Sequence, residues 1–417
     1  MPERTGGTLR VINARLPGHD QTVTLNIVDG VYADALPDGA DAVELDAAGR
    51  LCVPGFVEPH IHLDKALLLG DVPVNESGTL EEAITIVGEH KKALSGDDIA
   101  RRAREIADSA LSHGVTRIRT HVDIDTRSGL VAFDALRAMR AELGDLVDIQ
   151  IVAFPQNGIV GDPGVEDLLR KAMDRGADAI GGMPFNEDGP EASRRHIDIA
   201  FAIAEESGCD VDMHVDESDD PDARTLEMLC EATIANGYQG RVTAGHTCAL
   251  AAYPDDYAKR VIDLAAKAEV SIITNPGTNM MLQGRADAHP KRRGITRVRE
   301  LLAAGVNVAF GQDNLQDMFY PFGHDDPLEL AFLLAHAAHM GHPDDIATLF
   351  AMTHEHAAKA IGATDHGFAP GCTGDLVILD AESPLDAVIR RSPERTVIRR
   401  GETVCETSVS RSRRAVA

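Results

Sequence analysis

One stretch decides the fold: Val53-Pro-Gly-Phe-Val-Glu-Pro-His-Ile-His-Leu-Asp64. It begins at a Pro-Gly turn, continues as an apolar strand and ends in His60-x-His62. Because residues two apart in a strand point to the same side, both imidazoles are expected to face one interior point. Imidazole is the commonest protein ligand for zinc and iron. An isolated His-x-His also occurs by chance, so further ligands must come from the rest of the chain.

The composition is typical of a globular protein. The 417 residues suffice for one large domain and a smaller one, with 44% hydrophobic and 26% charged residues. A net charge of −27 excludes nucleic acid and anionic membranes as partners, because both select cationic surfaces. The N-terminus lacks the apolar core of a signal peptide, and the six cysteines contain no C-x-x-C pair. We therefore expect a soluble, cytoplasmic protein with reduced thiols.

The centre of the chain alternates apolar strands with amphipathic helices. Strands are predicted at 55–63, 115–124, 148–154, 179–183, 211–215, 241–246, 270–275 and 306–311, and helices at 97–113, 165–176, 195–207, 225–236, 255–268 and 294–304. Eight strands separated by helical segments indicate an α/β fold of the (β/α)8 TIM-barrel type. A doubly wound open sheet is the alternative, but the G-x-G-x-x-G turn typical of it does not follow the first strand.

Both ends of the chain have a different, β-rich character. Short alternating or apolar runs separated by turns occur at 8–13, 22–28 and 42–46, and again at 374–380 and 396–404. We expect residues 1–53 and 365–417 to form one small β-sandwich domain beside a barrel of residues 54–364.

Polar side chains gather at the carboxyl ends of the predicted barrel strands, where barrels of this type place their active sites. The side chains at these ends are His60, His62, Gln156, His214, Glu217, His246, Asp313 and Asn314. A buried histidine or aspartate without a partner costs on the order of several kcal/mol, so chance placement of the whole set is disfavoured.

This set predicts one divalent metal ion, Fe²⁺ or Zn²⁺. The ligands we expect are His60, His62, His214 and Asp313. Three neutral nitrogens and one carboxylate leave a position for water, whose pKa the metal lowers from about 15.7 to near 7. Glu217 is expected to move a proton between this water and the leaving group. His246 is expected to hydrogen-bond the hydroxide or the developing oxyanion.

Three further positions bear on this prediction. The fourth strand ends in Met183-Pro184 without Lys or Glu, so a binuclear centre is not expected. His121, near the end of the second strand, either supports a metal ligand or is a packed core histidine. The basic run Lys291-Arg292-Arg293 is expected to open the helix predicted at 294–304 and to be a solvated face.

Together these motifs resemble the amidohydrolase superfamily, and within it the cytosine deaminase branch. The resemblance is carried by Pro59–Asp64, Thr120–Asp123, Phe154–Ile159, His214–Asp220, Val242–Thr247, Leu282–Val298 and Gly311–Asn314. It spans the barrel and the terminal sheet domain. It implies that the four expected ligands bind iron or zinc, that Glu217 and Asp313 move protons, and that His246 steadies the hydroxide. It also implies that Gln156 reads the substrate ring by its amide and that the chain forms a homo-oligomer.

The sequence departs from the family pattern around the expected substrate. Asn314 stands where the family has a second Asp, Phe319 stands where it has Trp, and Asn157 follows Gln156 where it has Glu. A site that hydrogen-bonds one ring pattern rejects others, so these replacements are expected to affect the choice of ring.

We therefore expect hydrolytic deamination of a small amino-substituted N-heterocycle, cytosine or a related aminopyrimidine, with release of ammonia. Amino-triazines, creatinine-like rings and pterins are alternative substrates, and loss of an alkylamine from a triazine would use the same residues. Cyclic-amide hydrolysis is a weaker alternative, since it would favour a lysine where Met183 stands. A metal-binding scaffold without activity is the non-enzymatic alternative.

Overall fold

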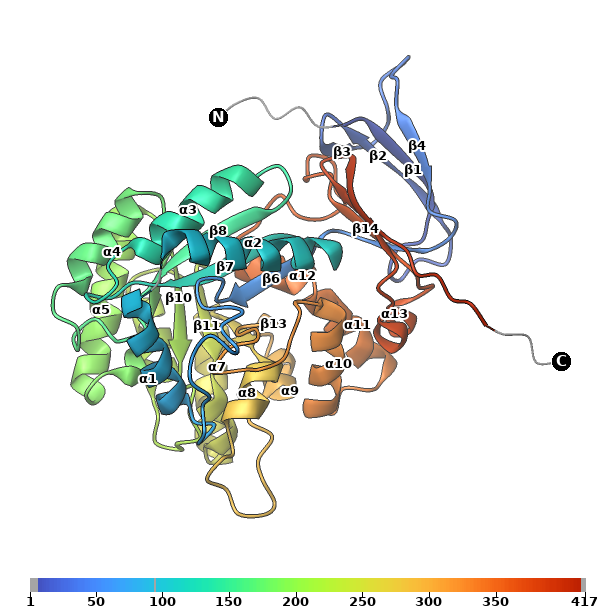
Figure 1. Cartoon of the computed structure of the whole chain (residues 1–417). Coiled ribbons are helices and arrows are strands. Elements are labelled where there is room, and N and C mark those ends of the chain that lie inside the picture. The colour runs from blue at the N-terminus through green and yellow to red at the C-terminus, as the bar shows by residue number, and fades with distance from the viewer. Residues whose placement is uncertain (1–6, 94, 414–417) are drawn as a thin grey trace.

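Eight parallel strands form one sheet that curls into a nearly closed barrel (Figure 1). The computed structural model describes residues 7–93 and 95–413. The strands are β6 (Phe56–Ile61), β7 (Val115–Asp123), β8 (Asp148–Phe154), β9 (Ala179–Gly182), β10 (Asp210–Val215), β11 (Val242–His246), β12 (Ser271–Thr274) and β13 (Val308–Phe310). They are hydrogen-bonded in chain order from β6 to β13. Just beyond β13, the Asp313 backbone N–H donates to the His60 carbonyl oxygen at 2.7 Å. The predicted barrel is confirmed.

Helices cover the outside of the barrel (Figure 1). Those that follow barrel strands include α2 (Gly96–Ser112), α3 (Val131–Leu143), α4 (Val165–Asp174), α5 (Pro190–Ser207), α6 (Thr225–Ala235), α7 (Asp255–Lys267) and α9 (Val298–Ala303). The remaining α-helices are α1 (Leu80–His90), α8 (Pro276–Leu282), α10 (Pro327–Ala337), α11 (Pro343–Met352), α12 (Glu355–Ala360) and α13 (Pro384–Arg390). Within the described ranges, none of the helices is long and apolar enough to cross a membrane.

Two helix starts differ from the prediction. Helix α5 begins at Pro190 rather than at residue 195, because proline is well suited to a first helical turn and the apolar periodicity begins only later. Helix α9 begins at Val298 rather than at residue 294. There, Thr296 shares a hydrogen bond with Thr247 at 2.9 Å and Arg297 donates to the Leu250 carbonyl oxygen at 3.0 Å. These tertiary contacts hold the segment before Val298 outside the helix.

The two ends of the chain build a β-sandwich beside the barrel, as predicted (Figure 1). One sheet has the order β3 (Val31–Ala33), β2 (Val23–Val28), β1 (Leu9–Ala14), β4 (Val43–Asp46), and the other the order β16 (Glu402–Thr407), β15 (Arg395–Arg399), β14 (Leu376–Leu379), β5 (Leu51–Val53). Buried Val11 and Ile27 of the first sheet share a core with Ile378 and Ile398 of the second. Strand β5 leads directly into β6, so the first barrel strand is anchored on the sandwich.

A buried ion pair joins the sandwich to the barrel. Arg395 of β15 contacts the Asp326 Oδ2 atom at 2.7 Å, and both side chains are buried. The same guanidinium donates to the His113 carbonyl oxygen at the end of α2. Asp326 also caps α10, because its Oδ1 atom accepts the Leu328 N–H at 3.0 Å. One arginine therefore fixes a sandwich strand against two barrel helices.

Replacing Arg395 with Met is expected to destabilise the protein by about 3–5 kcal/mol, because the Asp326 carboxylate stays buried without its partner. The measurement is the midpoint of urea unfolding. Arg390→Met is the matched control, since Arg390 pairs with Asp386 on an exposed helix surface and should change the midpoint little. Equal midpoints for R395M and the wild type would contradict the assignment.

Candidate functional site

The side chains predicted at the strand ends converge at one end of the barrel. His60 Nε2 and His62 Nε2 each lie 3.4 Å from Asp313 Oδ1, and His62 Nε2 lies 3.0 Å from His214 Nε2. Ligand atoms of His60, His214, His246 and Asp313 lie within 4.8 Å of one another. All five side chains are buried.

The chemistry of this cluster fits a divalent metal ion. Both ring nitrogens of His60, the Nδ1 atoms of His62 and His214, and Asp313 Oδ2 are buried without a hydrogen-bond partner among the described residues. Burial lowers the pKa of His60, His62 and His214 well below the usual value, so these rings are neutral near pH 7. Buried lone pairs on neutral imidazoles beside a carboxylate cost free energy unless a cation binds them. The buried His/Asp cluster is therefore consistent with one divalent metal site.

The backbone makes room for the cluster. A Cβ atom on Gly245 would lie 2.8 Å from His60 Cε1, and one on Gly311 would lie 2.7 Å from the His60 carbonyl oxygen. His246 and Asp313 have φ angles of +69° and +63°, a conformation that costs side-chain-bearing residues free energy and is concentrated at functional sites. The two glycines and these two turns set the positions of the cluster side chains.

The hydrogen bond from Asn279 favours one tautomer of His246. The Asn275 backbone N–H donates to Asn279 Oδ1 at 3.1 Å, so the other branch of this amide, Nδ2, donates to His246 Nδ1 at 2.9 Å. Burial lowers the pKa of His246 to about 4. In the resulting neutral ring the proton is on Nε2, which makes that atom a hydrogen-bond donor.

Glu217 lies beside His246, on the segment that follows β10. Its Oε1 atom is 3.3 Å from His246 Nδ1. Burial raises the pKa of Glu217 well above the usual value, and the charge of Asp313 raises it further. A glutamic acid that keeps its proton near neutral pH can act as a general acid.

A small cavity adjoins the cluster. It is lined by His62, Lys65, Leu80, Phe154, Gln156, Met183, His214, Glu217, Asp313, Asn314 and Phe319. All three residues predicted to contact the substrate, Gln156, Asn314 and Phe319, therefore line it. Asn314 donates from Nδ2 to Asp317 Oδ2 at 2.7 Å, and burial raises the pKa of Asp317 to about 7. The Asn314 amide nitrogen is thus engaged by a neighbouring side chain.

Sequence reasoning missed a buried charged group at the wall of this cavity. Lys65 Nζ lies 2.8 Å from Asp123 Oδ1 and 2.7 Å from Gln156 Oε1. A signal was present, because Asp123 ends the second barrel strand and Lys65 follows His-Ile-His-Leu-Asp directly. The rule that selected the other residues at strand ends applies to this pair as well.

His121 lies between the cluster and a buried carboxylate. Its Nε2 atom is 3.1 Å from Asp212 Oδ1, and its ring centroid is 4.1 Å from that of His60. Arg119 contacts the other oxygen of Asp212 at 3.0 Å. His121 therefore pairs with Asp212 and packs its ring against that of His60.

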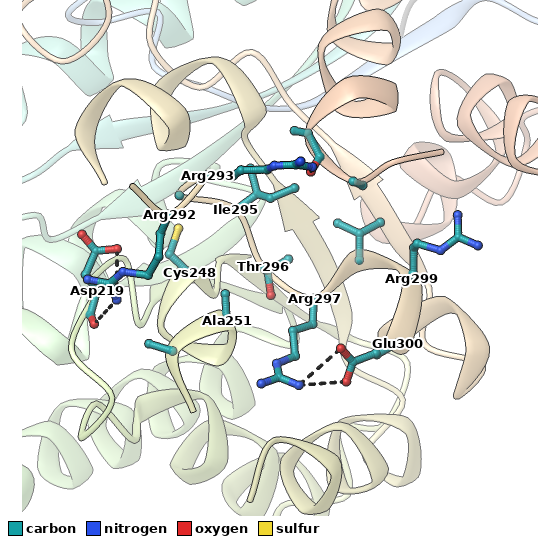
Figure 2. Close-up of a pocket in the computed structure, with 15 residues that line it drawn as sticks. Asp219, Cys248, Ala251, Arg292, Arg293, Ile295, Thr296, Arg297, Arg299 and Glu300 are labelled. Atoms are coloured by element: carbon teal, nitrogen blue, oxygen red, sulfur yellow. Dashed lines mark hydrogen bonds and ion pairs between the residues drawn. The ribbon is translucent and has the colours of Figure 1, made fainter. Parts of the chain in front are cut away.

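A second hollow lies beside the barrel, at the segment before α9 (Figure 2). Arg292 lies 2.6 Å from Asp287 and 3.7 Å from Asp219, and Arg297 lies 3.1 Å from Glu300. Residues 291–293 are exposed, as predicted, but precede the helix by several residues. Because two of its arginines are paired with carboxylates, this hollow is not a strong anion site.

Comparisons with known proteins agree with the fold and with the resemblance to a family. A model described as "Amidohydrolase family" matches residues 43–406, so the chain belongs to the amidohydrolase family. The structure of 5-methylcytosine deaminase from Klebsiella pneumoniae, liganded with 5-fluorocytosine, is 38% identical with a TM-score of 0.91, covering 97% of this chain and 99% of that one. The resemblance to cytosine-deaminase-like members of the family is thereby confirmed.

Two further similar proteins are named for other ring systems. A pterin deaminase of Rhizobium rhizogenes is 33% identical over 385 residues, which cover 91% of this chain and 86% of the relative. The structure of N-isopropylammelide isopropylaminohydrolase from Burkholderia multivorans is 30% identical with a TM-score of 0.84, covering 96% of this chain and 98% of that one.

Gly245→Ala is expected to weaken metal binding about 10- to 100-fold, because the added methyl group displaces the His60 ring that Gly245 accommodates. The measurement is bound metal per chain after dialysis against graded chelator. Gly341→Ala is the control, since a Cβ atom there meets nothing within 4 Å. Equal metal retention by G245A and G341A would argue against His60 as a ligand.

Proposed function

We propose that this protein hydrolyses the exocyclic amine of a small amino-substituted N-heterocycle, cytosine or a related aminopyrimidine, and releases ammonia. The observation that carries this proposal is the juxtaposition of two features in one buried cavity. One is the His/Asp cluster with unpaired ligand atoms, and the other is Glu217, whose pKa burial and the charge of Asp313 raise. Together they supply what hydrolytic loss of an amine requires, an activated water and a proton for the leaving group.

The proposed metal ligands are His60, His62, His214 and Asp313, and the proposed ion is Fe²⁺ or Zn²⁺. When bound, such an ion makes hydroxide available at neutral pH and polarises the group under attack. Glu217 gives its proton to the ring amine, which leaves as ammonia. The oxygen of the attacking water stays on the ring as an oxo group, and its remaining proton moves to the adjacent ring nitrogen. Asp313 accepts the proton lost by the attacking water, and His246 donates from Nε2 to the developing oxyanion.

The choice of ring is supported by the relatives and by the cavity. The similar proteins named above act, by their names, on 5-methylcytosine, on pterin and on an isopropylamino-substituted triazine. We propose that Gln156, Asn314 and Phe319 contact the ring, as their position in the cavity wall permits. Asn314 and Phe319, the departures from the family pattern, then tune which ring is preferred. We also propose a homo-oligomer in the cytoplasm.

Removal of an alkylamine is a second candidate with its own observation. A separate hollow whose lining includes Leu69, Val74, Met281 and Met318, together with Arg285 and Asp317, lies on another side of the Phe319 wall. Loss of an alkylamine would use the same reacting residues. Cyclic-amide hydrolysis is less well supported, because Met183 lines the cavity where a carbamylated lysine would be needed.

Ammonia release from a panel of amino-heterocycles tests the proposal. The panel contains cytosine, 5-methylcytosine, isocytosine, pterin and amino-triazines, with N-isopropylammelide assayed for isopropylamine. Turnover of an amino ring by the zinc- or iron-loaded protein supports deamination. Release of isopropylamine alone would favour the second candidate. No release of ammonia or isopropylamine from any compound of the panel would contradict both candidates.

Glu217→Gln is expected to lower kcat on the best substrate about 100- to 10,000-fold, because the amide cannot deliver a proton. Metal content should stay at the wild-type value. Glu205→Gln, a substitution on an exposed surface of α5, is the control and should leave kcat unchanged. A wild-type kcat for E217Q would contradict the role of Glu217 as the proton donor.

A further inference from the structure

Lys65 is a buried lysine in the cavity wall that the proposed mechanism does not use. Its side chain is almost fully buried, and it lines the cavity together with Gln156 and Glu217. Within the described part of the chain, its ammonium hydrogen-bonds to Asp123 Oδ1 and Gln156 Oε1. Since an ammonium carries three N–H groups, one remains for a ligand in the cavity.

The lysine also defines the orientation of Gln156. An ammonium only donates hydrogen bonds, so the atom of Gln156 at 2.7 Å from Lys65 must be the oxygen Oε1. The amide nitrogen on the other branch is then the group that Gln156 can offer to a ligand. Lys65 and Gln156 therefore both offer N–H donors to a ligand, and the Gln156 oxygen is already engaged by Lys65.

The positive charge of Lys65 is kept in place by a buried network. Asp123 also lies 2.5 Å from Lys91, which in turn contacts Asp125 at 3.1 Å. The backbone N–H of Asp123 donates to Asp64 Oδ2 at 3.0 Å. Asp123 is therefore shared between two buried lysines, and this network fixes the position of the Lys65 side chain.

Two aromatic rings lie near the same ammonium. The Lys65 Nζ atom is 5.7 Å from the ring centroid of Phe154 and 5.7 Å from that of Phe319. These rings also line the cavity, so a planar ligand in contact with them lies close to the donor groups of Lys65 and Gln156.

We propose that Lys65 and Gln156 form a donor-only edge that selects amino-heterocycles carrying an oxo group. The oxo oxygen accepts from the free N–H of Lys65 and from the Gln156 amide. A ring with a C–H or an amino group at that edge leaves both donors buried and unpaired, which disfavours it strongly. This inference rests on the proposed function and names the substrate class for the same site. Lys65 is thus a specificity-determining residue that also positions Gln156.

The test compares ring pairs that differ by the oxo oxygen, cytosine with 4-aminopyrimidine and pterin with 2-aminopteridine. The wild type should have the higher kcat/KM for the oxo member of each pair it turns over. Lys65→Met should lower the ratio of the two kcat/KM values about 10- to 100-fold, mainly through KM, because a hydrogen bond to a charged donor is lost. Asp123 keeps Lys91 as a partner in this variant, so the protein is expected to fold.

Lys259→Met is the control. Lys259 is an exposed lysine of α7 that pairs with Asp263, far from the Lys65 network, so K259M should keep the wild-type ratio of the two kcat/KM values. Binding of 2-pyrimidinone, which has the oxo group and no amine, gives a readout that does not depend on turnover. Calorimetry should detect this binding in the wild type and in K259M, and about 10- to 100-fold weaker binding in K65M.

The outcomes separate this inference from the proposed function. Equal ratios for K65M and the wild type, or equal affinity for 2-pyrimidinone, would overturn the role of Lys65 even if rings are deaminated. The opposite outcome is a wild type that binds 2-pyrimidinone more tightly than K65M does but releases no amine from any ring. That result would overturn the proposed function and support the role of Lys65 in binding the oxo group.

Discussion

Closure of the barrel between its first and last strands is the constraint on which the site depends. The Asp313 N–H donates to the His60 carbonyl oxygen at 2.7 Å, and the Asp313 carbonyl oxygen accepts the His62 N–H at 2.9 Å. These two backbone hydrogen bonds bring Asp313 beside His60 and His62, which precede it by 253 and 251 positions, so that all three side chains belong to one cluster. Glu58 strengthens the closure, since its carboxyl group accepts the backbone N–H groups of both His60 and Gln312.

Most of the fold was predictable because most barrel strands are short, mainly apolar runs and helices such as α4 and α7 have a regular apolar face. Residues at strand ends were predictable for the same reason, since parallel strands bring their carboxyl ends to one edge. The starts of α5 and α9 were not, because a polar first turn and tertiary hydrogen bonds of Thr296 and Arg297 leave no periodic signal. Such contacts exist only once distant segments meet.

The same limit explains what was missed in the site. That Lys65 contacts Gln156 depends on side-chain reach across two strands, and a linear pattern does not encode it. The orientation of His246 depends likewise on Asn279, which lies on α8. The metal cluster could be predicted from residue types at strand ends alone. Prediction of the substrate contacts requires distances between side chains, which the sequence does not give. Specificity was therefore harder to predict than the class of chemistry.

The dependence of amine release on metal occupancy tests the central claim most directly. The protein is stripped of metal and titrated with Zn²⁺ or Fe²⁺ while bound metal and ammonia release from the best substrate are measured together. The proposed mechanism predicts that activity rises in proportion to bound metal and reaches its maximum at about one ion per chain. Full activity in the stripped protein, or a maximum only at two ions per chain, would contradict it.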